Sequence, residues 1–224
     1  MKGLIKTLYI AIGISLAMPA LAGDWKPTDF QQRLEPKRLP MVESDYSGKV
    51  NTDPRFIADR QAIVNHVTAY AYLLDEGRWD QWFDLFTDDV VFETTTPCFG
   101  TIIARGKAAF QGVVDLRYRG PGSEKNTTVR RHTMGNVHVA RQTRDNAEVR
   151  TYMLISAAPE PGKGTFQVLT SGTYNASLKK IDGRWKITRW YIEVDAPLKA
   201  SAMPKGAVSK DITFIPDNRP GCRK

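Results

Sequence analysis

Four long segments with the composition of β-strands follow one another between Arg130 and Asp195, and they constrain the fold more than any other feature of the chain. The segments span 130–142, 147–158, 165–179 and 184–195. Turn-forming sequences separate them, around Asp145-Asn146, Pro161-Gly162 and Asp182-Gly183. Because short turns join neighbouring strands that run in opposite directions, the sequence predicts a consecutive antiparallel sheet.

Three helical segments are predicted before this sheet. The first begins after Asp53-Pro54 and ends near Gly77, and its apolar positions recur at helical spacing: Ile57, Ile63, Val67, Tyr70, Ala71 and Leu74. A short second helix is expected over 78–86, with an apolar stripe of Trp79, Trp82, Phe83 and Phe86, and a third over 106–118. Short strands are expected at 90–93 and 101–104. The predicted fold is α+β, a cone in which a curved antiparallel sheet and three helices enclose a pocket.

The first 22 residues have the pattern of a secretory signal peptide. Lys2 and Lys6 precede an apolar run from Leu8 to Met18, and Ala20-Leu21-Ala22 forms a small-residue cleavage site. The run is too short for a permanent membrane span. We therefore expect a periplasmic or secreted protein that has no membrane partner after cleavage.

The remaining sequence suggests one domain with an extension at each end. Residues 23–55 form a polar, proline-rich N-terminal arm, since proline at this density prevents a long helix. Residues 56–195 are expected to form the domain, and residues 196–224 form a C-terminal tail of similar composition to the arm. The arm either wraps the domain or pairs with a neighbour.

The charge of the chain gives no sign of a nucleic-acid partner. The net charge of +8 falls to +6 when Lys2 and Lys6 leave with the signal peptide. The remaining Lys and Arg residues are scattered along the tail and the turns, whereas nucleic-acid binding needs a basic stripe or patch. We expect no nucleic-acid partner.

The two cysteines, Cys98 and Cys222, can pair in an oxidising compartment. A bond between them would close a loop of roughly 120 residues, which stabilises the fold by about 4 to 5 kcal/mol in the chain-entropy model. The alternative is two unrelated thiols.

The histidines do not predict a metal site. His132 and His138 are separated by six residues of strand, roughly 20 Å, and His66 is the only other histidine. The chain also lacks a phosphate-binding glycine loop and a G-x-S-x-G nucleophile motif. We expect no metal and no cofactor.

Asp75 and His132 are the candidate catalytic pair. Asp75 ends the first helix, where the helix dipole disfavours a carboxylate, and His132 begins the first long strand. A carboxylate and an imidazole brought together in an apolar pocket form a general base with an orienting partner. Strand alternation places Met134 and Asn136 on the same face as His132. The alternatives are a solvated Asp75, or one paired with Arg78, and a structural His132.

Three segments resemble the SnoaL-like group of the nuclear-transport-factor-2-like (NTF2-like) superfamily, which includes scytalone dehydratases and bile-acid dehydratases. They are A-Y-A-Y-L-L-D-E-G-R-W-D-Q-W-F-D-L-F-T-D-D-V-V-F at 69–92, R-H-T-M-G-N-V at 131–137 and L-K-K-I-D-G-R-W-K-I at 178–187. The resemblance implies catalytic roles for Asp75, His132 and Tyr70, and a homodimer formed through the sheet. In scytalone dehydratases a second catalytic His follows on the next strand, where this chain has Tyr152 or Met153.

The sequence therefore predicts a lyase (dehydratase) or isomerase that removes a proton from a small apolar or aromatic hydroxy or carbonyl compound. The expected substrate-binding residues are Asn136, Tyr152, Met153, Tyr174 and Trp190, although core packing is the alternative for each aromatic side chain. The alternative function is a non-catalytic ligand-binding or assembly protein of the same fold.

Overall fold

In the computed structural model, the first element among the described residues is a 22-residue helix, α2 (Pro54–Asp75). The structure describes residues 51–115, 118, 129–158, 165–196, 210–219 and 222. The Asp53 side chain caps α2 by accepting the backbone N–H of Arg55 at 2.8 Å. After the helix, Gly77 has a φ of 66°, a conformation that favours glycine. Both predicted ends of this helix are confirmed.

Two shorter helices follow, α3 (Trp79–Asp84) and α4 (Lys107–Val114). Helix α3 ends two residues earlier than predicted, because Phe86 already belongs to the first strand and pairs with Ile187. The Phe86 ring still packs against Trp82, with ring centres 5.4 Å apart. The apolar stripe was therefore a correct indication of burial, but its last member is not helical.

The strands form a seven-stranded sheet in the order β3-β4-β5-β6-β1-β2-β7. Their bounds are β1 Phe86–Thr96, β2 Gly100–Arg105, β3 Val129–Gln142, β4 Asn146–Ala158, β5 Gln167–Ile181, β6 Arg184–Val194 and β7 Ile212–Pro216. Strands β3 to β6 pair consecutively and antiparallel, which confirms the predicted meander. Strand β1 pairs parallel to β6 and antiparallel to β2. Both β1 and β2 are longer than the short strands that the sequence indicated.

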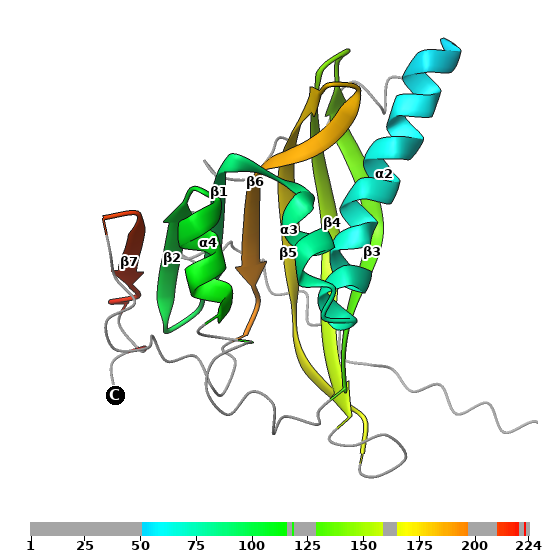
Figure 1. Ribbon diagram of the computed structural model, residues 1–224. Coiled ribbons are helices and arrows are strands. Elements are labelled where there is room, and N and C mark those ends of the chain that lie inside the picture. Colours follow the sequence, from blue (N-terminus) through cyan, green and yellow to red (C-terminus); the bar gives the residue numbers. More distant parts are fainter. Residues whose placement is uncertain are drawn as a thin grey trace, which may run out of the picture. The chain divides into compact units, whose positions relative to one another are not determined.

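Strand β7 lies in the C-terminal tail, where the sequence indicated no strand. It pairs antiparallel with β2 at the edge of the sheet (Figure 1). A side chain at Gly100 would lie 2.2 Å from the backbone oxygen of Ile215, so the close approach of β7 requires glycine there. A pattern of only five residues that ends in proline is a weak strand signal.

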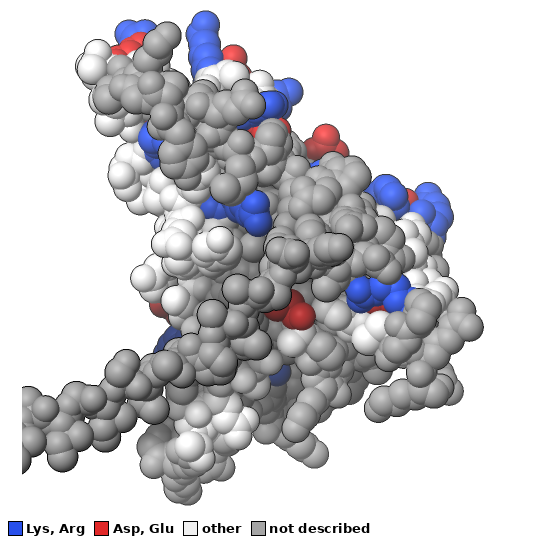
Figure 2. Space-filling model, turned by 180° about the vertical axis from the view of Figure 1, so that it is seen from behind, with Lys and Arg blue, Asp and Glu red and all other residues white. Residues whose placement is uncertain are grey.

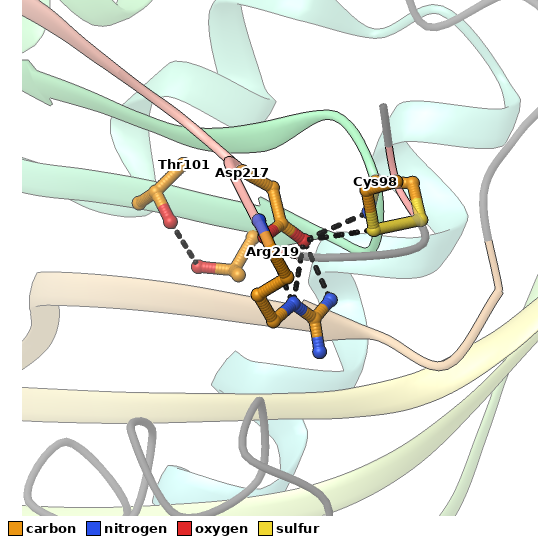
Figure 3. A network of polar contacts seen from close by, with 6 residues as sticks. Cys98, Thr101, Asp217 and Arg219 are labelled. Atoms are coloured by element: carbon orange, nitrogen blue, oxygen red, sulfur yellow. Dashed lines mark hydrogen bonds and ion pairs between the residues drawn. A yellow bond between two sulfur atoms is a disulfide. The ribbon is translucent and has the colours of Figure 1, made fainter. Parts of the chain in front are cut away.

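A disulfide bond between Cys98 and Cys222 joins the turn after β1 to the segment after β7. Next to it, the Asp217 carboxylate accepts the backbone N–H of Cys98 at 2.9 Å and the Nε–H of Arg219 at 2.8 Å (Figure 3). These contacts connect the end of β7 to the β1–β2 turn. Of the two alternatives for the cysteines, the structure has the bond.

The helices lie on one face of the sheet, where α2 packs against β3 and α4 against β1 (Figure 1). Between the two layers is an aromatic core that includes Tyr70, Trp82, Phe86, Phe110 and Trp190. Figure 2 shows the molecule from the opposite side, where the described Lys and Arg side chains lie in separate groups. The fold is α+β, as predicted.

Several predictions concern segments outside the described residues. They are the signal peptide at 1–22, nearly all of the arm at 23–55 and most of the tail at 196–224. The domain boundaries therefore remain predictions. Within the described ranges, no helix has both the length and the apolar character needed to cross a membrane.

Candidate active site

His132 and Asp75 are in direct contact, although 57 residues separate them in the sequence. His132 lies near the start of β3, and Asp75 is the last residue of α2, the helix that packs on this strand. The Nδ1 atom of His132 lies 2.5 Å from Oδ1 of Asp75, and the backbone N–H of His132 donates to Oδ2 at 2.8 Å. Both oxygens of the carboxylate therefore bind the same residue.

Both members of the pair are buried. The side chains of His132 and Asp75 are 5% and 8% exposed. A carboxylate at a helix C-terminus is disfavoured by the dipole by about 0.3 to 1 kcal/mol, and the two hydrogen bonds from His132 offset that cost. Asp75 is thus neither solvated nor paired with Arg78, which instead contacts Glu76.

This contact fixes the tautomer of the neutral imidazole. An ionised carboxylate can only accept hydrogen bonds, so Nδ1 of His132 carries the proton. The lone pair then lies on Nε2, at the opposite side of the ring. This is the form that can accept a proton from a substrate, with Asp75 stabilising the imidazolium that results.

A cavity between the helices and the sheet exposes His132 to a ligand. Its lining is Tyr70, Leu74, Trp82, Phe92, Thr94, Thr96, Val113, Val114, Tyr118, His132, Met153, Ile155, Tyr174, Ile192 and Val194. Among these residues His132 is the only one with a basic side chain, and none carries a carboxylate. The cavity volume is about 50 Å³, enough for a few water molecules. A larger ligand requires lining side chains such as the flexible Met153 to move.

Tyr70, Met153 and Tyr174, three of the predicted site residues, line this cavity. Tyr70 comes from α2, and its ring lies 5.3 Å from that of Tyr174 on β5. Met153 lies on β4, in register with Met134 of β3. Tyr70 and Asp75 are on different faces of α2, and only Tyr70 lines the cavity. Asp75 is connected to the cavity through His132, which contacts Asp75 and also lines the cavity.

Trp190 lies behind the cavity instead of lining it. It is fully buried, and its ring stacks on Tyr70 with the centres 4.2 Å apart. The expectation that Trp190 contacts the substrate is therefore corrected: its contact with a ligand would be indirect, through the position of the Tyr70 ring.

Asn136 and Tyr152 do not reach the cavity, which corrects two further expectations. The pairing of β3 with β4 shifts register between Gly135 and His138, and Asn136 lies in this irregularity with a φ of 51° and an exposed side chain. Strict alternation from His132 therefore breaks before Asn136. Tyr152 is 57% exposed, because it alternates with Met153 and points away from the helices.

Sequence reasoning missed most of the wall that strands β1 and β6 contribute. Phe92, Thr94 and Thr96 follow one another at every second position of β1, and Ile192 and Val194 do so on β6. This period of two was a usable signal. It could not be used without the parallel pairing of β1 with β6, which no local pattern indicates.

The other two histidines lie elsewhere. His66 donates from Nε2 to the backbone oxygen of Leu85 at 3.0 Å, and burial lowers the pKa of its imidazole. His138 follows the irregularity in β3 and is paired with Arg150 of β4. In the part of the chain that the structure describes, no group of three or more His, Cys, Asp or Glu side chains could hold a metal ion.

The sequence pattern of the SnoaL-like domain matches residues 55–191 of the chain. No curated protein matches it. A candidate scytalone dehydratase from Novosphingobium aromaticivorans DSM 12444 has a similar structure, with 20% identity and a TM-score of 0.50, over 66% of this chain and 97% of that one.

Two further solved structures from the same organism are similar. The β subunit of a candidate aromatic-ring-hydroxylating dioxygenase is 19% identical, with a TM-score of 0.50, over 62% of this chain and 90% of that one. An NTF2-like protein with a cystatin-like fold is 20% identical, with a TM-score of 0.50, over 69% of this chain and 92% of that one. At these identities the likeness concerns the fold.

The sheet with helices over one face and a cavity between them is the fold of an NTF2-like protein. Within this class, the chain belongs to the SnoaL-like family, whose pattern covers more than half of its length.

Proposed function

We propose that this protein is an exported lyase (dehydratase) or isomerase that acts without a cofactor on a small, largely apolar hydroxy or carbonyl compound. The observation that carries the proposal is the His132–Asp75 contact beside a cavity with an otherwise uncharged lining. Export rests on the signal-peptide pattern of residues 1–22. The candidate scytalone dehydratase among the similar structures is consistent with this choice.

His132 is the general base in the proposed reaction. Its Nε2 lone pair takes the proton from a carbon next to a carbonyl group, and the C–H electrons move to the carbonyl oxygen as an enolate. In a dehydration, the enolate then expels a β-hydroxyl group, which leaves as water with the proton from His132. In an isomerisation, His132 returns the proton to a different carbon. Asp75 stays ionised throughout and stabilises the imidazolium.

Tyr70 is proposed to stabilise the enolate. Its ring lines the same cavity as His132, and Trp190 holds one face of that ring. A phenol hydroxyl that donates a hydrogen bond to the developing oxyanion lowers the barrier only in the transition state. Asn136, the other candidate for this role, is excluded by its exposed position.

Proton abstraction can be tested before the substrate is known. We would incubate the protein in D₂O with a panel of β-hydroxy ketones and unsaturated ketones and follow deuterium incorporation by NMR. His132→Ala and Asp75→Asn should slow incorporation roughly 100- to 10,000-fold for any compound that the wild type exchanges. His138→Ala, on the same strand outside the cavity lining, is the matched control and should retain exchange.

Circular dichroism of each variant separates lost chemistry from lost fold. Equal exchange rates in the wild type and a folded His132→Ala variant would show that His132 is not the general base. No exchange across the panel would instead favour the rival function, a non-catalytic binding or assembly protein. Two observations support this rival function: the small cavity volume and the similarity to the β subunit of a candidate dioxygenase.

A further inference from the structure

Arg130 is a half-buried cation next to the candidate site, and the proposed reaction does not use it. It precedes His132 by two residues on β3, and the register pairs Arg130 with Ala157 and His132 with Ile155 of β4. Residues two apart on a strand share a face and lie about 7 Å apart. Arg130 is therefore on the helix side of the sheet, one step along β3 from the base, whereas the intervening Arg131 is exposed.

The guanidinium of Arg130 lies against the wall of the cavity. Its Cζ is 5.7 Å from the ring centre of Tyr118, and Tyr118 lines the cavity together with His132. A guanidinium over the face of an aromatic ring is held in place by the negative charge of the π system. Arg130 itself is not part of the lining, but it is in contact with Tyr118, which is.

The Arg130 side chain has unused hydrogen-bonding capacity. Its Nε–H is buried and finds no hydrogen-bond acceptor among the residues that the structure describes. A buried donor on a charged group destabilises the protein while it lacks an acceptor, and a bound anion would supply that acceptor. A carboxylate fits best, because its two oxygens match the fork of donors on a guanidinium.

We propose that Arg130 binds a carboxylate group of the substrate while the apolar body of the molecule occupies the cavity. This inference rests on the proposed function and narrows its substrate class to apolar hydroxy or carbonyl compounds that carry a carboxylate. The spacing along β3 adds a geometric condition: the carboxylate and the carbon that loses its proton should be on the order of 7 Å apart.

Matched pairs of probes test the proposal by binding alone. The pairs are crotonate with crotonamide and trans-cinnamate with trans-cinnamamide, each pair differing mainly in charge, and NMR shift titration gives the Kd values. We expect the wild type to bind the carboxylate of at least one pair tenfold or more tighter than the amide. Arg130→Gln should remove this preference and leave the affinity for the amide unchanged.

Two further variants serve as controls. Arg131→Gln changes the exposed neighbour and should keep the preference. Arg130→Lys keeps the positive charge but loses the paired donors of the guanidinium, and it should keep part of the preference for the carboxylate. This variant therefore still tests the proposal if Arg130→Gln does not fold. Equal affinities in the wild type, a preference that survives in Arg130→Gln, or no binding of either carboxylate would overturn the proposal.

The outcome is separable from that of the proposed function. His132→Ala should retain the carboxylate preference, because binding to Arg130 needs no proton transfer. If the protein prefers carboxylates but exchanges no substrate proton, the proposed lyase or isomerase function is refuted and the anion site at Arg130 is not. If the protein exchanges protons of neutral compounds but shows no preference for carboxylates over amides, the role of Arg130 is refuted and that of His132 as general base is not.

Discussion

At the scale of single residues, Asp217 carries a large electrostatic effect. Its side chain is 5% exposed and binds the guanidinium of Arg219, which lowers the pKa of the carboxyl from 3.8 to about 2. A carboxyl whose pKa is lowered by folding stabilises the folded state above the unfolded pKa. That contribution is lost as the pH falls toward the folded value.

We therefore expect Asp217→Asn to lower the free energy of unfolding by about 2 kcal/mol at pH 6. The difference between wild type and variant should begin to shrink below about pH 4 and vanish near pH 2. Urea unfolding of both proteins across this range measures it. A difference that stays constant down to pH 2 would show that the loss comes from packing and not from the charge.

Single residues also limit how far alternation can be extended along a strand. From His132 to Met134 a period of two holds, and it fails at Asn136, where β3 shifts register against β4. The residues of R-H-T-M-G-N-V give no local sign of this break beyond a Gly-Asn pair. The position of His132 could be predicted, and that of Asn136 could not.

At the scale of elements, β7 depends on its pairing with β2 and on the disulfide bond to the β1–β2 turn. It is a five-residue edge strand, and the Cys98–Cys222 bond ties the chain after it to the turn between β1 and β2. Because the bond spans 124 residues, it restricts the unfolded chain strongly.

The double variant Cys98→Ser with Cys222→Ser should be about 3 kcal/mol less stable than the oxidised protein, with an upper bound near 5 kcal/mol. Amide exchange should increase most in β7 (Ile212–Pro216), since this edge strand has one neighbour. Urea unfolding and hydrogen exchange read by mass spectrometry measure the two effects. A reducing agent should destabilise the wild type and leave the double variant unchanged; equal sensitivity of both would contradict the role of the bond.

At the scale of the whole molecule, the outer face of the sheet bears on the predicted homodimer. On β4, Tyr152 is 57% exposed and Leu154 is 38% exposed, at alternate positions that point away from the helices. Apolar side chains on an open sheet face are suited to contact a second copy of the chain.

We expect the wild type to be a dimer in light scattering, and the double variant Tyr152→Ser with Leu154→Ser to be largely monomeric. Because both side chains lie outside the cavity, the variant should bind the probes described above as the wild type does. Ile57→Ser, which changes an exposed apolar residue on α2, is the control and should leave the mass unchanged. A monomeric wild type at high concentration would refute the dimer.

The order of helices and long strands followed from local patterns alone, because hydrophobic periodicity and turn residues act over a few positions. For the same reason, the Asp53-Pro54 start of α2 and the consecutive pairing of β3 to β6 were predictable. The choice of Asp75 and His132 required the family resemblance as well, since nothing local connects a helix end with a strand 57 residues away.

Tertiary structure alone decided which side chains share the cavity. The parallel pairing of β1 with β6 brings Thr94 beside Ile192, and the packing of α2 on β3 brings Asp75 to His132. The placement of β7 beside β2 and the contact of Arg130 with Tyr118 were decided in the same way. Each depends on contacts between distant segments, whose free energy a window of neighbouring residues does not contain.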